Sequence, residues 1–192
     1  MQNYIQNNWV EISGAILSLI YLYLSIKQKA SLWIFGLMSS VLYVVVFIQS
    51  KLYADMSLQF YYVFISIYGW INWKFGREVV ENELPVKRLS RKMILILIGI
   101  TILIYGAYFV LLNYFTDSKV PKFDSLIGAL SVVATWMLAR KYIENWLVWI
   151  VADGLAIGLF VYKELYPTAI LFIVYTVMSV VGYRQWSKPT VR

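Results

Sequence analysis

Seven long hydrophobic runs, separated by short polar stretches, dominate this 192-residue sequence. Each run has roughly 18 to 23 residues, which matches the ~20 residues that an α-helix needs to cross a hydrocarbon layer of ~30 Å. The apolar residues are continuous rather than alternating, so the pattern indicates helices and not the strands of a closed barrel. The sequence therefore predicts membrane spans at about 9–27, 32–50, 55–75, 92–113, 123–140, 145–163 and 166–186.

The sequence also contains an internal repeat. When the chain is aligned with itself so that Glu11 falls on Asp124, without gaps, many positions coincide. Several of them are Trp, Gly or acidic residues, which chance similarity between two apolar stretches would rarely match. We call this fixed shift the repeat offset. The matching pairs include Leu17/Leu130, Ser18/Ser131, Lys27/Arg140, Trp33/Trp146, Tyr62/Tyr175, Ser66/Ser179, Gly69/Gly182 and Trp73/Trp186.

Each repeat holds three spans, so two directly joined copies would have opposite orientations in the membrane. One additional span restores a common orientation. We therefore predict an all-α membrane protein of 3+1+3 design: a first three-helix repeat (9–75), a cytoplasmic connector (76–91), a linking helix (92–113) and a second repeat (123–186). Two parallel repeats related by an axis along the membrane normal would hold a substrate site between them, near the midplane.

The charge pattern predicts the orientation. The chain has 17 Lys and Arg residues against 10 acidic ones. With the N-terminus outside, only Lys51, Lys119, Lys122 and Lys163 face outward, as the positive-inside rule requires of a bacterial inner (cytoplasmic) membrane protein with its C-terminus in the cytoplasm. This rule explains the net charge of +7 without nucleic acid as a partner. The stretch 74–92 is expected to be a solvated loop.

Candidate chemistry centres on Asp153, the one acidic residue that falls near the middle of a span. A charge at that depth is costly, so a functional role is the default hypothesis. Three structural roles compete with it: a protonated packing residue, a partner of Ser or Tyr on another helix, and a proton-coupling site. The spans place no Lys, Arg or His at comparable depth, which favours a cationic ligand as the partner.

Two tryptophans share the face of Asp153 at helical spacing. Indole rings attract flat aromatic cations by stacking and by cation–π attraction. We expect Trp149, the deeper of the two, to contact the ligand, and Trp146 to be an anchor at the membrane interface. The predicted substrate-binding set comprises Asp153, Trp149, Gln59, Trp146, Tyr62, Tyr175, Ser179, Ser66 and Trp33.

The repeats differ at two of the polar positions. Asp153 corresponds to Ser40, and Gln59 corresponds to Phe172. An asymmetric ligand on a pseudo-symmetric scaffold would produce this pattern. The chain has no His and no Cys, and one deep carboxylate supplies no catalytic pair, so we expect neither an enzyme nor a bound metal or cofactor.

Two stretches of sequence resemble the Pnu vitamin transporters. The first is LYADMSLQ at 52–59, followed by Tyr68-Gly69-Trp70 and Trp73; the second is KYIENWLVW at 141–149, with Gly182 and Trp186 near the end of the chain. The resemblance implies a seven-helix, full-length SWEET-like fold, facilitated diffusion, and trapping of the vitamin by phosphorylation inside the cell. It also implies a homotrimer.

Within that family, the nicotinamide riboside branch (PnuC) has Asn where Asp153 stands, and the aspartate is similar to the thiamine branch (PnuT). The resemblance therefore predicts a thiamine (vitamin B1) uniporter in which Asp153 pairs with the thiazolium and Trp149 stacks on the ligand. The alternatives are nicotinamide riboside or another flat vitamin precursor as substrate, and proton-coupled transport.

Overall fold

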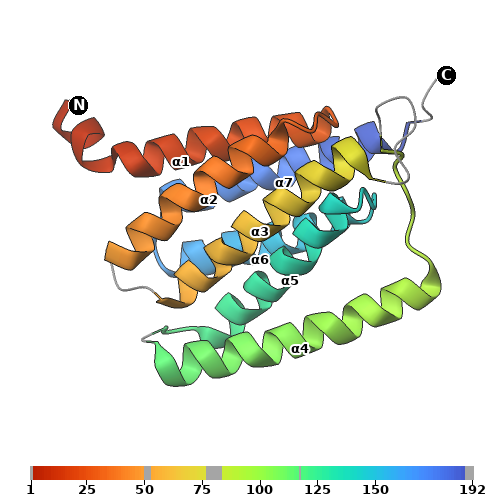
Figure 1. Ribbon diagram of the computed structural model, residues 1–192. Helices are drawn as coiled ribbons and strands as arrows, with labels where there is room; N and C mark the ends of the chain where they lie inside the picture. The colour runs from red at the N-terminus through yellow and green to blue at the C-terminus, as the bar shows by residue number, and fades with distance from the viewer. Residues whose placement is uncertain (1, 50–52, 77–83, 117, 189–192) are drawn as a thin grey trace.

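The computed structural model describes residues 2–49, 53–76, 84–116 and 118–188. Within them the chain forms seven helices (Figure 1), which confirms the seven predicted helical segments to within a few residues at most boundaries. They are α1 (Gln2–Ile26), α2 (Leu32–Gln49), α3 (Tyr53–Phe75), α4 (Arg91–Phe115), α5 (Pro121–Ala139), α6 (Asn145–Tyr162) and α7 (Tyr166–Trp186). Lys51, Arg77 and the remainder of 77–83 in the predicted connector lie outside the described residues.

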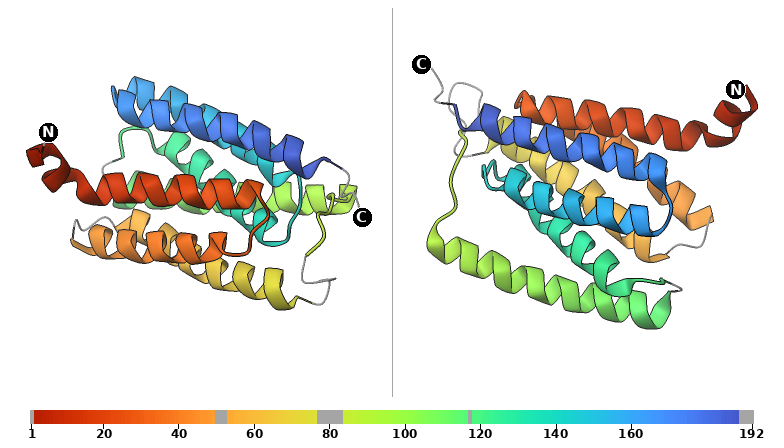
Figure 2. Two further views of the ribbon diagram at one scale, coloured as in Figure 1. Left: turned by 90° about the horizontal axis from the view of Figure 1, so that it is seen from above. Right: turned by 180° about the vertical axis from the view of Figure 1, so that it is seen from behind.

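The helices pack as two groups with α4 at the edge. Helices α1, α2 and α3 form the first half of the molecule, in which α2 packs on the other two. Helices α5, α6 and α7 form the second half, in which α6 packs on the other two. The halves meet where α3 lies against α5 and where α1 lies against α7, as the views in Figure 2 show. Helix α4 packs on α5 and leaves most of its surface uncovered.

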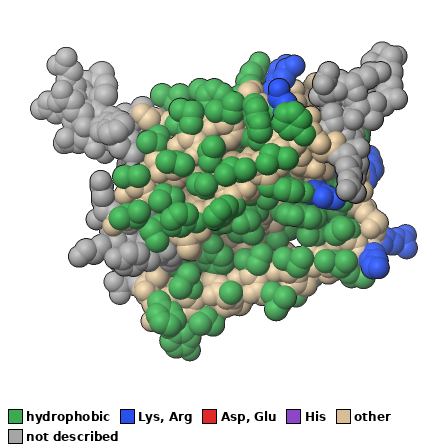
Figure 3. Space-filling model, in the orientation of Figure 1, with side chains coloured by type: hydrophobic (Ala, Val, Ile, Leu, Met, Phe, Trp, Pro, Cys, Tyr) green, Lys and Arg blue, Asp and Glu red, His purple; other side chains and the backbone are tan. Residues whose placement is uncertain are grey.

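The outer surface suits a lipid environment. Four described helices, α4 to α7, are long and apolar enough to cross a membrane, and shorter apolar stretches occur at Ile16–Ile26 and Leu32–Val45. Hydrophobic side chains cover most of the face in Figure 3, and its Lys and Arg side chains gather towards the end near the C-terminus. An exterior of this kind would aggregate in water, so the chain is a multi-pass membrane protein.

The repeat offset recurs in the backbone. Gln28 and Lys141, which correspond to each other at this offset, both have a left-handed conformation, with φ of 56° and 58°. The next amide after each closes the same turn: Lys29 N donates to the Leu24 carbonyl and Tyr142 N to the Met137 carbonyl, both at 2.9 Å. Helices α1 and α5 therefore end in the same Schellman turn, which satisfies carbonyls that the helix leaves unpaired.

The largest buried cluster lies at the end of the bundle where these turns occur. Its centre is four tryptophans that we call the tryptophan layer: Trp33, Trp73, Trp146 and Trp186. Their side chains are buried. The centroids of neighbouring rings lie 5.8 Å apart for Trp33–Trp73, 6.2 Å for Trp73–Trp186 and 5.5 Å for Trp146–Trp186. Aromatic pairs at these distances contribute packing energy beyond the area they bury.

The described part of the connector, from residue 84 onward, is only in part the solvated loop that we expected: Pro85, Arg88 and Ser90 are exposed, but the segment is also bound to the turn between α5 and α6. Lys87 forms two backbone hydrogen bonds of 2.9 Å with the turn between α5 and α6, donating to the Lys141 carbonyl and accepting from Ile143 N. Leu84 is 3% exposed and belongs to the main cluster. Backbone groups that leave water need partners, and the α5–α6 turn supplies them to this segment.

Candidate functional site

Two adjoining pockets lie between the halves of the molecule. The polar pocket, of about 220 Å³, is lined by Leu17, Ser18, Tyr21, Gly36, Ser39, Ser40, Tyr43, Gln59, Tyr62, Ser66, Thr135 and Trp149. The acidic pocket, of about 290 Å³, is lined by Ser18, Tyr21, Leu22, Ser25, Tyr62, Leu138, Trp146, Trp149, Asp153, Tyr175 and Ser179. Four side chains line both pockets (Ser18, Tyr21, Tyr62 and Trp149), so the two pockets form one candidate site.

Eight of the nine predicted site residues line this site. Gln59 and Ser66 line the polar pocket; Trp146, Asp153, Tyr175 and Ser179 line the acidic pocket; Tyr62 and Trp149 line both. The ninth, Trp33, lies in the tryptophan layer, edge-on to the Tyr21 ring at 6.3 Å. Trp33 is not among the lining residues of either pocket, because its ring packs on Gly69 and Trp73 of α3; its role in substrate binding stays a prediction.

Asp153 lies in α6 with 4% of its side chain exposed. Its carboxylate accepts a hydrogen bond from the Ser179 hydroxyl of α7, the Ser-partner arrangement considered among the structural roles. A carboxylate has acceptor positions for about four hydrogen bonds, so this one partner among the described residues leaves most of its capacity for a ligand in the acidic pocket. A ligand cation that also donates hydrogen bonds would use this capacity.

The two indoles near Asp153 have different surroundings. Trp149 lines both pockets, as expected of a ligand contact. Trp146 is 1% exposed and packs on Trp186, so the expectation of an interface anchor is wrong. Its ring fills the space above Gly182, where a Cβ atom would lie 2.7 Å from three ring atoms. Because the close approach needs a glycine, the burial of Trp146 depends on α7.

Two Ser–Tyr hydrogen bonds join the halves beside the pockets. The Ser18 hydroxyl of α1 bonds to the Tyr175 hydroxyl of α7, and the Ser131 hydroxyl of α5 bonds to that of Tyr62 in α3. Both partners of the second bond correspond to those of the first at the repeat offset. The sequence repeat pairs Ser18 with Ser131 and Tyr62 with Tyr175, but it does not predict that each serine bonds to the tyrosine of the other half.

Some lining residues escaped the sequence analysis. Tyr21 borders both pockets, and Tyr43 and Ser39 border the polar one. Tyrosines are frequent throughout this chain, with 16 in all, so type and spacing alone did not distinguish these positions. Among the described residues, no three His, Cys, Asp or Glu side chains come together as a metal site would need.

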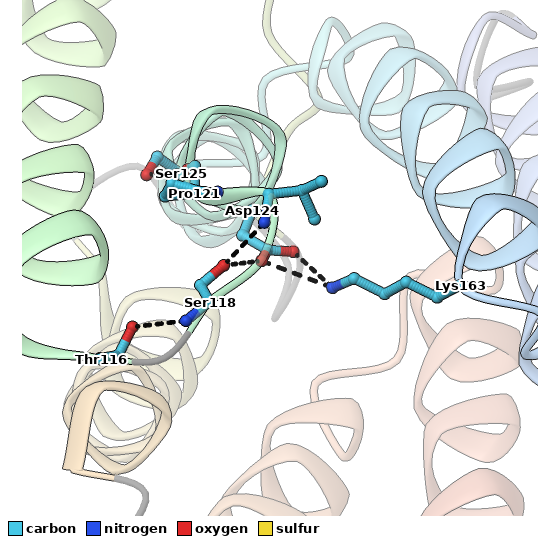
Figure 4. Close-up of polar contacts among 7 residues, drawn as sticks. Thr116, Ser118, Pro121, Asp124, Ser125 and Lys163 are labelled. Carbon is cyan, nitrogen blue, oxygen red and sulfur yellow. Dashed lines mark hydrogen bonds and ion pairs between the residues drawn. The ribbon is translucent and has the colours of Figure 1, made fainter.

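An ion pair lies at the end of the second half opposite the tryptophan layer. At the start of α5, the Asp124 carboxylate is 3.1 Å from Lys163 Nζ at the end of α6, and it accepts from Ser118 Oγ at 2.6 Å (Figure 4). The contact ties the loops before α5 and after α6 together. The candidate site thus lies between an ion pair at one end and an aromatic core at the other.

Comparisons with known proteins cover almost the whole chain. Residues 8–188 match the family described as Nicotinamide mononucleotide transporter. The chain is 28% identical over 203 residues to nicotinamide riboside transporter PnuC of Escherichia coli (strain K12), covering 93% of this chain and 85% of that protein. It is 26% identical over 193 residues to the protein of the same name from Neisseria mucosa, covering 95% and 73%.

A solved structure is also similar. The crystal structure of the vitamin B3 transporter PnuC superposes with a TM-score of 0.76 at 26% identity, covering 96% of this chain and 83% of that chain.

Proposed function

Because the chain belongs to the nicotinamide mononucleotide transporter family, and so is a Pnu-type membrane transporter of a small molecule, we propose that its cargo is a flat, cationic, unphosphorylated vitamin. The observation that carries this proposal is the acidic pocket. It pairs the buried carboxylate of Asp153 with the partly exposed indole of Trp149. A carboxylate attracts the positive charge, and the indole stacks on a flat ring.

The rest of the lining favours a vitamin without phosphate. Neither pocket has a Lys or Arg among its described lining residues, whereas phosphate recognition in proteins relies on such groups or on clustered backbone N–H donors. The polar pocket instead offers hydroxyls and the Gln59 amide, which suit sugar hydroxyls or the edge of a heterocycle. Phosphorylation inside the cell would therefore prevent the product from returning through the site.

Nicotinamide riboside is the first candidate. The relatives in Escherichia coli and Neisseria mucosa carry its name, and its pyridinium ring is a flat cation. Its ribose hydroxyls match the polar pocket. This reverses the order in which the sequence analysis placed the two substrates, since no relative reported above is named for thiamine.

Thiamine stays the second candidate because of one specific feature. Its aminopyrimidine donates hydrogen bonds in addition to the charge on its thiazolium. Asp153 retains several acceptor positions beyond its bond to Ser179, so it could serve both groups.

The transport cycle that we propose is facilitated diffusion by two parallel three-helix repeats, 9–75 and 123–186, with α4 as the linking helix. Support comes from the matched turns after α1 and α5 and from the Ser–Tyr bonds that repeat at the same offset. In this proposal the N-terminus lies outside the cytoplasm and the C-terminus inside. The homotrimer implied by the family resemblance stays a prediction, as does the absence of enzymatic activity.

Binding measurements on the purified carrier test the cargo. Titrations would compare nicotinamide riboside, thiamine and their monophosphates, with quenching of tryptophan fluorescence as the signal. We expect at least one vitamin to bind ten-fold or more tightly than its monophosphate. We expect Asp153→Asn to weaken binding of thiamine by about 10- to 100-fold, the range of a hydrogen bond to a charged group, and binding of nicotinamide riboside less, because the family resemblance gives its branch Asn at this position.

The matched control is Asp124→Asn, which makes the same chemical change in the ion pair far from the pockets. It should leave affinity unchanged. Equal affinity of Asp153→Asn and the wild-type protein for every vitamin would refute the role of the carboxylate. Uptake into liposomes with and without a pH gradient tests the uniport mechanism, and accumulation driven by the gradient would contradict it.

A further inference from the structure

The floor of the acidic pocket is built from matching positions of the two halves. Ser25 in α1 and Leu138 in α5 correspond to each other at the repeat offset, and both line the pocket next to Trp146. Directly beyond them lies the tryptophan layer, which separates the pocket from the end of the bundle that carries the connector. A ligand that leaves the site towards that end must pass this layer.

Contacts within each half hold the layer tightly. Trp33 packs on Gly69 of its own half, where a Cβ would lie 2.4 Å from the ring, and Trp146 packs on Gly182 of its own half. The ring contacts Trp33–Trp73 and Trp146–Trp186 are likewise internal to a half. Each pair of tryptophans is therefore packed mainly within the half that supplies it.

Hydrogen bonds also join the two halves at this layer. Trp73 and Trp186, which correspond at the repeat offset, each donate one from the indole, and Asn72 Nδ2 donates to the Ala139 carbonyl as well, at 2.9 Å. Trp73 Nε1 of the first half donates to the Ala139 carbonyl of the second half at 3.1 Å. Trp186 Nε1 of the second half donates to the Ser25 carbonyl of the first half, also at 3.1 Å. These carbonyls lie at the ends of α5 and α1, and the Ser25 carbonyl also accepts from Gln28 N at 3.0 Å within its turn. We call the two indole hydrogen bonds the latches.

We propose that the tryptophan layer is a gate of the carrier, which opens when both latches and the neighbouring Asn72–Ala139 hydrogen bond break and the layer parts between Trp73 and Trp186. The inference rests on the proposed function, since only a carrier needs to open here. The indole N–H groups of Trp33 and Trp146 are buried without a hydrogen-bond partner in the closed layer. When the layer parts, water can hydrogen-bond to these two N–H groups, and this gain offsets part of the free energy lost when the latches break.

The gate can be tested through a reporter at its pocket side. The chain has no cysteine, so Ser25→Cys introduces a single thiol without background. Ser25 Oγ has no hydrogen-bond partner, and the substitution leaves the carbonyl that accepts the latch unchanged. A membrane-impermeant maleimide would be added to vesicles from the side of the C-terminus or from the opposite side, and the labelling rate measured.

We expect slow labelling from the side of the C-terminus in the Ser25→Cys background. Trp73→Phe and Trp186→Phe each remove one latch while keeping an aromatic ring, and each should raise that rate about five-fold, the factor for one net hydrogen bond. The double variant should raise it about 25-fold if the two latches act independently. Labelling from the opposite side should not rise, because a gate at one end opens to one side.

The matched control is Trp136→Phe, which shortens an indole that packs on the same cluster but forms neither latch. The gate is refuted if the latch variants leave the rate unchanged, if Trp136→Phe raises it equally, or if labelling rises from both sides as general loosening would cause. Leu138→Cys repeats the experiment from the other half should Ser25→Cys fold poorly. Labelling needs no vitamin, so failure to bind one would refute the proposed cargo while the labelling result still decides the gate.

Discussion

Gly182→Ala is the substitution whose cost the structure specifies most directly. A Cβ atom at this position would lie 2.7 Å from three ring atoms of Trp146, whereas ordinary contacts begin near 3.4 Å. The ring cannot retreat freely, because it is 1% exposed and packs edge-on against Trp186 with ring centroids 5.5 Å apart. The substitution therefore overpacks the tryptophan layer.

A second glycine separates the steric cost from the intrinsic preference of the helix. Gly154 also lies inside a helix, but a Cβ there would meet nothing within 4 Å. Both substitutions gain up to about 1 kcal/mol in helix propensity, and this gain cancels when the two variants are compared. The remaining difference is the overpacking cost, about 1–3 kcal/mol. For a chain of this size it corresponds to a melting temperature roughly 2–12 °C lower in Gly182→Ala than in Gly154→Ala.

Thermal unfolding in detergent, followed by tryptophan fluorescence, measures this difference. Gly69→Ala is a second test, since its Cβ would lie 2.4 Å from Trp33 in the matching position of the first half. It should behave like Gly182→Ala. Equal melting temperatures of Gly182→Ala and Gly154→Ala would mean that the ring is not held against the glycine, and the close packing of the layer would be refuted.

Other contacts give predictions of different size. Lys163→Met removes the ion pair with Asp124; because both side chains are partly exposed, we expect a loss of stability below about 1 kcal/mol that shrinks further in high salt, checked by melting at two salt concentrations. Tyr175→Phe removes the hydroxyl that bonds to Ser18 across the halves and should cost about 1 kcal/mol in thermal unfolding; no change would contradict a bond between the halves. Lys141→Met removes a buried donor 2.6 Å from a connector carbonyl and should cost about 1–3 kcal/mol, with faster proteolysis of the connector; unchanged cleavage would show that the connector is held by other contacts.

The sequence by itself determined the seven helical segments and the correspondence between the two halves. Run length decides whether a segment can cross a hydrocarbon layer, and this property is local to the segment. The repeat offset alone pairs Gly69 with Gly182, the two glycines that pack against the tryptophan layer. Helical spacing also brought together eight residues that line the pockets, because it places them on faces that point inward.

Tertiary structure alone decided what several of these residues do. A tryptophan near the end of a span can be an interface anchor or a core residue, and the sequence is the same for both; only the packing of α6 on α7 buries Trp146. The Trp33 ring packs on α3 and not in the pocket lining, and Leu84 belongs to the core because its segment is hydrogen-bonded to the α5–α6 turn. Such outcomes depend on how neighbouring helices meet, and the spacing of residues within one helix does not specify its neighbour.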